Sequence, residues 1–96
     1  MALTTVNDVE ILEKVKSALG INGNYQNDTL SVYIEEVKAY MRAGGVSLDV
    51  INSTLAVGAI CRGVADLWNY GASTAEFSTY FMQRVTQLAY ENGGGE

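Results

Sequence analysis

Apolar side chains recur at steps of three and four residues along four stretches of the chain, and glycine or small polar residues separate the stretches. This spacing places apolar side chains on one face of an α-helix, whereas a half-buried strand would alternate apolar and polar positions. Glycine marks the boundaries because the chain contains no proline. The pattern predicts an all-α fold, a compact four-helix bundle-like domain with short linkers and a long central third helix.

The first two predicted helices have clear starts and ends. Asn7 with Glu10 three residues later has the spacing of a capping box, and Gly20 ends the first helix. The second helix begins near Asp28 and ends before the glycine pair at 44–45. The apolar stripes are Val9, Leu12, Val15 and Leu19 in the first helix and Leu30, Tyr33, Ile34, Val37 and Met41 in the second.

Residues 20–27 are predicted to form a polar loop between these helices. The Asn-Gly pair at 22–23 is also typical of a β-hairpin turn, but its flanking residues follow helical spacing and do not alternate. A short extended segment at this place stays open as an alternative.

The third predicted helix runs from Ser47 to about Asn69 and is apolar on nearly every side, which is typical of an enclosed helix. Gly58 and Gly63 inside it each cost about 1 kcal/mol relative to alanine. We therefore expect another helix backbone or a bulky ring to pack closely against both glycines.

The fourth predicted helix begins with Ser73 and Glu76, which have the S-x-x-E spacing of a capping box. The residues after it, from Asn92, are nearly all glycine. We expect one helical domain over residues 1–92 and a flexible Gly-rich tail over residues 93–96. The apolar stripe of this helix is Phe77, Tyr80, Phe81, Val85, Leu88 and Ala89.

Composition narrows the possible functions. The 96 residues are 48% hydrophobic and 18% charged, which is too apolar for a disordered chain and sufficient for one small core. There is no histidine and only one cysteine, Cys61, so the usual zinc sites, Ser-His-Asp and Cys-His catalytic groups and an intrachain disulfide all lack components. Composition therefore predicts a protein that is not an enzyme and that has no cofactor and no metal.

The distribution of charge and apolar residues bears on location and partners. The chain opens without a basic or long apolar segment, and its richest apolar stretch, 55–68, is interrupted by two charges and is too short to span a membrane. We expect a soluble protein made in a reducing, intracellular compartment. The net charge of −5 argues against nucleic acid as the primary ligand, because that affinity comes from basic side chains.

Three polar features suggest chemistry, and each has a simpler structural interpretation. The Asn-rich segment before Asp28 lacks the alternating ligands and the closing glutamate of a calcium loop. Glu35 and Glu36 diverge by about 100° on a helix and cannot face one substrate together, so a solvated face explains them. Cys61 has no imidazole to activate it and is interpreted as a small buried thiol.

The six tyrosines are more suggestive of a protein interface. Tyr33 and Tyr80 fit the apolar stripes, whereas the other four fall at loops, helix flanks or helix ends, where an amphipathic ring serves an interface or closes the rim of a small core equally well. Arg62 and Asp66 are spaced i, i+4 and either pair with each other or reach a partner chain. The candidate interface residues are Tyr25, Tyr40, Arg62, Asp66, Tyr70 and Tyr90. The residues by themselves thus indicate an acidic, helical, non-catalytic interaction module.

The order of these motifs resembles a known family. Residues 15–21 (VKSALGI), an Asn/Asp-rich loop, residues 28–30 (DTL) with Tyr33, Ile34 and Val37, and then a long helix over residues 55–70 are similar to the head-tail connector (adaptor, or DNA-packaging) proteins of tailed bacteriophages. The likeness extends from about Val6 to Tyr90. One departure is the C-terminus, where only residues 92–96 follow the last helix in place of the longer, portal-docking extension of several family members.

The resemblance implies a structural virion protein at the head-tail junction, made in the host bacterial cytoplasm. Such a protein assembles with itself as a homo-oligomeric ring, dodecameric in the virion, between the portal protein and a tail-completion or stopper protein, and DNA passes without specific binding. An acidic channel wall suits this passage, because it repels phosphate. Candidates for that wall are Glu35 and Glu36 together with Asp8, Glu10 and Glu13, although an outward solvated surface explains them as well.

Two other function classes remain as alternatives. A helix-turn-helix nucleic-acid protein, such as a phage regulator or a small terminase subunit, needs a basic recognition helix, and none of the four predicted helices is basic. A small hydrolase or transferase needs a nucleophile with a base beside it, and no such pair is identifiable.

Overall fold

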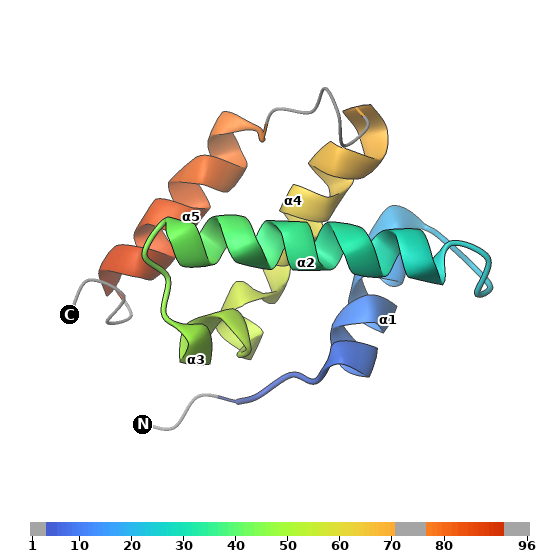
Figure 1. The fold of residues 1–96 in the computed structure, drawn as a ribbon, viewed down its shortest axis with the longest axis horizontal. Helices are drawn as coiled ribbons and strands as arrows, with labels where there is room; N and C mark the ends of the chain where they lie inside the picture. The colour runs from blue at the N-terminus through green and yellow to red at the C-terminus, as the bar shows by residue number, and fades with distance from the viewer. Residues whose placement is uncertain (1–3, 71–76, 92–96) are drawn as a thin grey trace.

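A computed structural model describes residues 4–70 and 77–91, and these residues are helical through most of their length (Figure 1). The all-α prediction is confirmed, since the only extended pairing among the described residues is an isolated antiparallel bridge between Thr5 and Ser53. The elements are α1 (Asp8–Leu19), α2 (Asn27–Ala43), α3 (Leu48–Ile51), the 3₁₀ helix η1 (Thr54–Ala56), α4 (Val57–Tyr70) and α5 (Thr79–Glu91).

The helices are arranged around the pair formed by α2 and α4. In Figure 1, α2 crosses the centre of the view with α4 behind it, while α1 lies toward one end of α2 and α5 toward the other. The apolar faces of all these helices share one core, so the fold has a single dry interior. The largest fully buried side chains are Phe81, Leu30, Met41, Ile60, Leu88, Val15, Val37, Val46, Val50, Val64 and Ser53.

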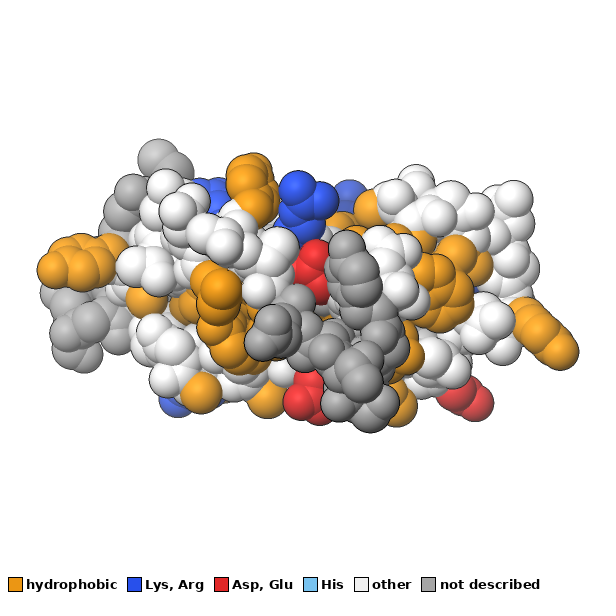
Figure 2. All heavy atoms as spheres, turned by 90° about the horizontal axis from the view of Figure 1, so that it is seen from above, with side chains coloured by type: hydrophobic (Ala, Val, Ile, Leu, Met, Phe, Trp, Pro, Cys, Tyr) orange, Lys and Arg blue, Asp and Glu red, His pale blue; other side chains and the backbone are white. Residues whose placement is uncertain are grey.

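The molecule is flat, measuring 39 × 28 × 16 Å along its principal axes. Figure 2 turns it so that the shortest axis is vertical. In that view most of the visible Lys and Arg side chains lie along the upper edge and one group lies at the lower edge, while Asp and Glu side chains lie along the lower edge and in the middle. None of the helices in the described residues is long and apolar enough to cross a membrane.

The start of α1 is the capping box that the sequence predicts. The Asn7 side-chain oxygen accepts the Glu10 backbone N–H at 2.8 Å, and the Glu10 carboxylate accepts the Asn7 backbone N–H at 3.2 Å. At the other end Gly20 adopts φ 72°, which L-residues with a side chain rarely tolerate. The predicted apolar stripe is correct for Val15 but wrong for Val9, which is 70% exposed because it lies about 200° around α1 from the buried Ile11.

The loop between α1 and α2 contains bends and turns and no strand, so the hairpin alternative is excluded for residues 20–27. Gly23 has φ 77°, as a tight turn requires. The second helix begins at Asn27, one residue before the predicted start, and Gln26 provides no side-chain cap.

The prediction of one continuous third helix from Ser47 to about Asn69 is wrong. The helix is broken after Ile51 into α3, η1 and α4. Ser53 causes the break, because its buried hydroxyl donates to the Val50 carbonyl at 2.7 Å and accepts the Leu55 backbone N–H at 3.2 Å. Serine, asparagine and threonine side chains compete for backbone groups in this way. The sequence 52–54 (NST) therefore indicated a helix break, which a prediction from apolar spacing alone does not reveal.

The N-terminal segment stabilises the same break from outside. The Val6 backbone N–H donates to the Asn52 carbonyl at 2.8 Å, and the Thr54 N–H donates to the Thr4 carbonyl at 2.9 Å. These bonds satisfy polar backbone groups that a helix interruption would otherwise leave unpaired. The break is therefore a packed feature of the fold.

The last helix begins later than predicted. Phe77 and Ser78 are not helical, and α5 starts at Thr79 with the Ser78 hydroxyl accepting the Phe81 N–H at 3.2 Å. The predicted capping residues, Ser73 and Glu76, lie outside the described residues, as does the tail at 92–96.

Candidate interaction surfaces

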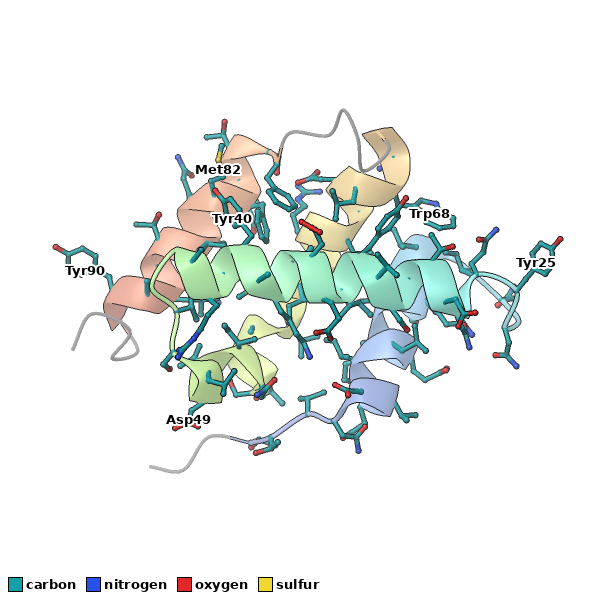
Figure 3. All side chains as sticks on the ribbon, viewed as in Figure 1. Tyr25, Tyr40, Asp49, Trp68, Met82 and Tyr90 are labelled. Atoms are coloured by element: carbon teal, nitrogen blue, oxygen red, sulfur yellow. The ribbon has the colours of Figure 1, made fainter. Side chains whose placement is uncertain are left out.

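Two of the predicted interface tyrosines stand at opposite ends of the molecule. Tyr25 projects from the α1–α2 loop and Tyr90 from the last turn of α5, and Figure 3 shows them pointing away from the fold at the two ends of its long axis. Their side chains are 95% and 87% exposed. Burial of such rings against a partner would remove apolar surface from water, whereas neither ring contributes to the core of this chain.

Tyr40, another predicted interface residue, packs partly against aromatic rings of its own chain. Its ring centroid lies 4.7 Å from that of Phe77 and 5.5 Å from that of Phe81, so the three rings join α2 to the start of α5. Tyr40 nevertheless stays 37% exposed, so part of it is accessible to a partner. The side chain of Tyr70, the fourth predicted interface tyrosine, lies outside the described side chains.

Arg62 and Asp66 have separate partners. The Asp66 carboxylate is 8% exposed and accepts the Ser78 backbone N–H at 2.9 Å, which fastens the connection before α5 to α4. The Arg62 guanidinium lies 4.9 Å from the centroid of the Tyr80 ring, a cation–π geometry. No ion pair joins Arg62 and Asp66 in the described part of the chain. Tyr80 itself is 63% exposed, so its predicted place in the core is wrong.

Glu35 and Glu36 lie on the outer face of α2. Both are exposed, and beside them stands Val32, an apolar side chain that is 63% exposed. We call this surface the α2 acidic face; it consists of Ser31, Val32, Glu35, Glu36 and Ala39.

A second surface, which the sequence analysis missed, lies on the outer side of α4. It is a shallow groove of about 320 Å³ between α1, α4 and α5. We call it the α4 groove; it is lined by Ala18, Leu19, Gly58, Cys61, Arg62, Ala65 and Tyr80. The sequence signal for it was Gly58, which lies inside the predicted third helix and in the first turn of α4, and whose conformational cost needs an explanation.

Cys61 is a partly buried member of the α4 groove. Burial raises the pKa of its thiol, and the nearby positive charge of Lys14 lowers it to a smaller extent. The thiol is therefore protonated near neutral pH. The prediction of a small buried thiol is correct only in part, because Cys61 is half-buried.

The Asn-rich loop has a structural role of its own. Lys16 is 6% exposed, and its ammonium group donates to the Asn24 side-chain oxygen at 3.2 Å. The Asn27 side-chain amide donates to the same oxygen at 3.3 Å. The loop thus partners a buried lysine, and no group of three or more acidic or cysteine side chains with the spacing of a metal site occurs in residues 4–70 and 77–91.

Comparison with known proteins identifies the kind of molecule that carries these surfaces. A family model described as phage gp6-like head-tail connector protein matches residues 10–91, which contain all of the described helices except the first two residues of α1. No curated protein and no solved structure matched the chain.

Proposed function

The chain belongs to the phage gp6-like head-tail connector family, and from that premise we propose that it forms a homo-oligomeric ring between the portal protein and a tail-completion or stopper protein. The family is one of structural connector proteins of phages, and its members are located in the virion. In this proposal the ring is dodecameric in the virion, and its central channel lets DNA pass. The family match over residues 10–91 carries the proposal.

The positions of the exposed aromatic rings support assembly with other chains. Tyr25 and Tyr90 stand at opposite ends of the molecule and are almost fully exposed. Contacts with neighbouring copies, with the portal or with the tail-completion protein would cover such rings, and tyrosine is enriched at interfaces of this kind.

The acidic balance of the chain supports passage of DNA without binding. With a net charge of −5, a wall formed by these copies repels phosphates over the roughly 10 Å that charge reaches at physiological salt. The exposed acids that are candidates for the wall are Asp8, Glu10 and Glu13 of α1 and Glu35 and Glu36 of α2.

Reconstitution with the portal protein of the same phage tests this function. The purified chain is mixed with assembled portal, and the product is examined by light scattering and electron microscopy. We expect a stoichiometric complex with a ring of this chain on one side of the portal. A chain that stays monomeric at high concentration and has no affinity for the portal contradicts the proposed function.

A further inference from the structure

We propose that neighbouring copies in the ring meet by placing the α2 acidic face of one copy in the α4 groove of the next. The inference rests on the proposed function, and it names the two different surfaces that a head-to-tail contact needs. Three observations carry it: the directions in which the two surfaces face, the open space at Gly58 and the opposite charges of the two surfaces.

The two surfaces face away from each other within one copy. A Cβ added at Gly63 would lie 2.9 Å from the Val37 methyl carbons, so these two residues mark where α4 and α2 touch. At about 100° per residue, Gly58, Cys61 and Ala65 lie about 160° to 220° around α4 from that contact. By the same arithmetic Val32, Glu35 and Ala39 lie about 160° to 220° around α2 from Val37.

Two surfaces that face opposite ways cannot contact each other within one chain. Each can contact the other surface on a neighbouring copy, and this contact can repeat from copy to copy. In the edge view of Figure 2, most of the visible basic side chains lie along one edge of the thin dimension, and the visible acidic side chains lie along the other edge and in the middle. A repeated contact of this kind closes into a ring when the rotation between copies divides the full circle.

Gly58 gives the groove room for an occupant. Gly58 is the second residue of α4, where glycine costs up to about 1 kcal/mol relative to alanine, and no atom of a neighbouring element in the described residues lies within 4 Å of an added Cβ. Among residues 4–70 and 77–91, no side chain packs against this position, in contrast to Gly63. Ala18 and Ala65 also line the groove, so small residues leave space there for a side chain of modest size. Val32 is an apolar side chain of that size and is 63% exposed.

The charges of the two surfaces are opposite. Arg62 lines the groove and is held against the Tyr80 ring, and the charge of Lys14 reaches Cys61 in the same groove. Glu35 and Glu36 flank Val32 on the other surface. Insertion of Val32 therefore brings carboxylates toward Arg62 and Lys14, while a partner with a basic face would be repelled. In this arrangement Glu35 and Glu36 lie at the seam between copies, and the α1 acids remain as candidates for the channel wall.

Disulfide trapping tests the contact, because the only native cysteine lies in the groove. We expect the Val32→Cys variant, oxidised with copper phenanthroline, to give a ladder of linked copies on a non-reducing gel. Two controls should give no ladder: Val32→Cys combined with Cys61→Ser, and Gln83→Cys, which places an exposed thiol on α5 instead. Rings in which Val32→Cys is linked no more than Gln83→Cys overturn the inference.

Charge reversal supplies an independent readout. Arg62→Glu, and separately Glu35→Lys with Glu36→Lys, should each raise the concentration needed for assembly at least tenfold, while circular dichroism shows an unchanged fold. Mixing the two variants should restore assembly, because each then presents a complementary face to the other. If single reversals leave assembly unchanged, or if the mixture does not recover, the seam lies elsewhere.

These outcomes are separable from failure of the proposed function. If the unmodified chain forms rings alone or on the portal and both tests are negative, only this seam is wrong. If the unmodified chain forms no ring under either condition, the proposed function itself fails, and the seam fails with it.

Discussion

Two glycines of the same helix show how much a single position depends on its surroundings. Gly63 has the Phe81 ring 2.8 Å and the Val37 methyls 2.9 Å from where a Cβ would stand, whereas Gly58 has open space. The expectation that both are crowded is correct for Gly63 and wrong for Gly58. Both positions are glycines of α4, and the difference between them comes from the side chains that the neighbouring helices place beside each one.

Alanine substitutions at the two positions should therefore have opposite effects on stability. Gly58→Ala should raise the free energy of unfolding by up to about 1 kcal/mol, because it removes the helix penalty of glycine in the first turn of α4 without a clash. Gly63→Ala should lower it by about 1 to 3 kcal/mol, because the methyl group displaces Phe81 and Val37. Urea denaturation of both variants measures the difference, and changes of the same sign contradict the described packing.

The Cys61 thiol offers a test of burial through its pH dependence. Because burial raises its pKa in the folded state, the neutral thiol is favoured by folding, and the associated stability is present at low pH and lost as pH rises through the folded pKa. Alkylation by iodoacetamide at pH 8 should be slower for the native chain than for the chain in urea.

Lys14→Gln should slow alkylation of the native chain further, because it removes the charge that lowers the Cys61 pKa. Arg84→Gln, on α5, is the matched control and should leave the rate unchanged. Equal native rates for Lys14→Gln and the unmodified chain would show that Lys14 does not act on this thiol.

At the scale of elements, the interruption between α3 and α4 decides how the middle of the chain packs. A continuous helix would leave no place for the N-terminal segment, which hydrogen-bonds to Asn52 and Thr54 at the break. The buried Ser53 hydroxyl both donates and accepts there. A short polar run thus divides an apolar stretch that its periodicity alone would assign to one helix.

Removal of the Ser53 hydroxyl should destabilise the fold. Ser53→Ala leaves the Leu55 backbone N–H without its side-chain acceptor, at a cost of about 1 to 3 kcal/mol in the free energy of unfolding. Thr54→Ala, at an exposed neighbouring side chain, should cost much less. Chemical denaturation compares the two variants, and equal losses would mean that the Ser53 hydroxyl does not maintain the break.

At the scale of the whole molecule, charge separates the connector role from the nucleic-acid alternative. Binding to DNA at physiological salt depends on counterion release by basic side chains, and this chain has six basic residues against eleven acidic ones. Lys16 is buried and Lys38 is paired with Asp8 at 3.5 Å, which reduces the basic groups available to DNA still further.

We therefore expect no gel shift of duplex DNA by this chain at about 150 mM salt. Lowering the salt should not produce the steep increase in affinity that accompanies multiple phosphate contacts. A shift that strengthens steeply as salt falls would instead favour a phage regulator or a small terminase subunit.

Features that depend on residues within one or two helical turns were predictable from the order of amino acids. The Asn7–Glu10 capping box, the end of α1 at Gly20 and the all-α class all follow from local spacing, because each partner lies a few residues away along the chain. The family likeness also follows from that order, and the family match confirms it.

Features that depend on which helix lies opposite were decided only by the tertiary structure. Asp66 accepts a hydrogen bond from the Ser78 amide and does not pair with Arg62. Tyr80 lies beside Arg62 and not in the core. Gly58 lines a groove formed by three helices. The physical reason is that burial and pairing are set by packing between segments distant in sequence, and helical periodicity describes only one helix at a time.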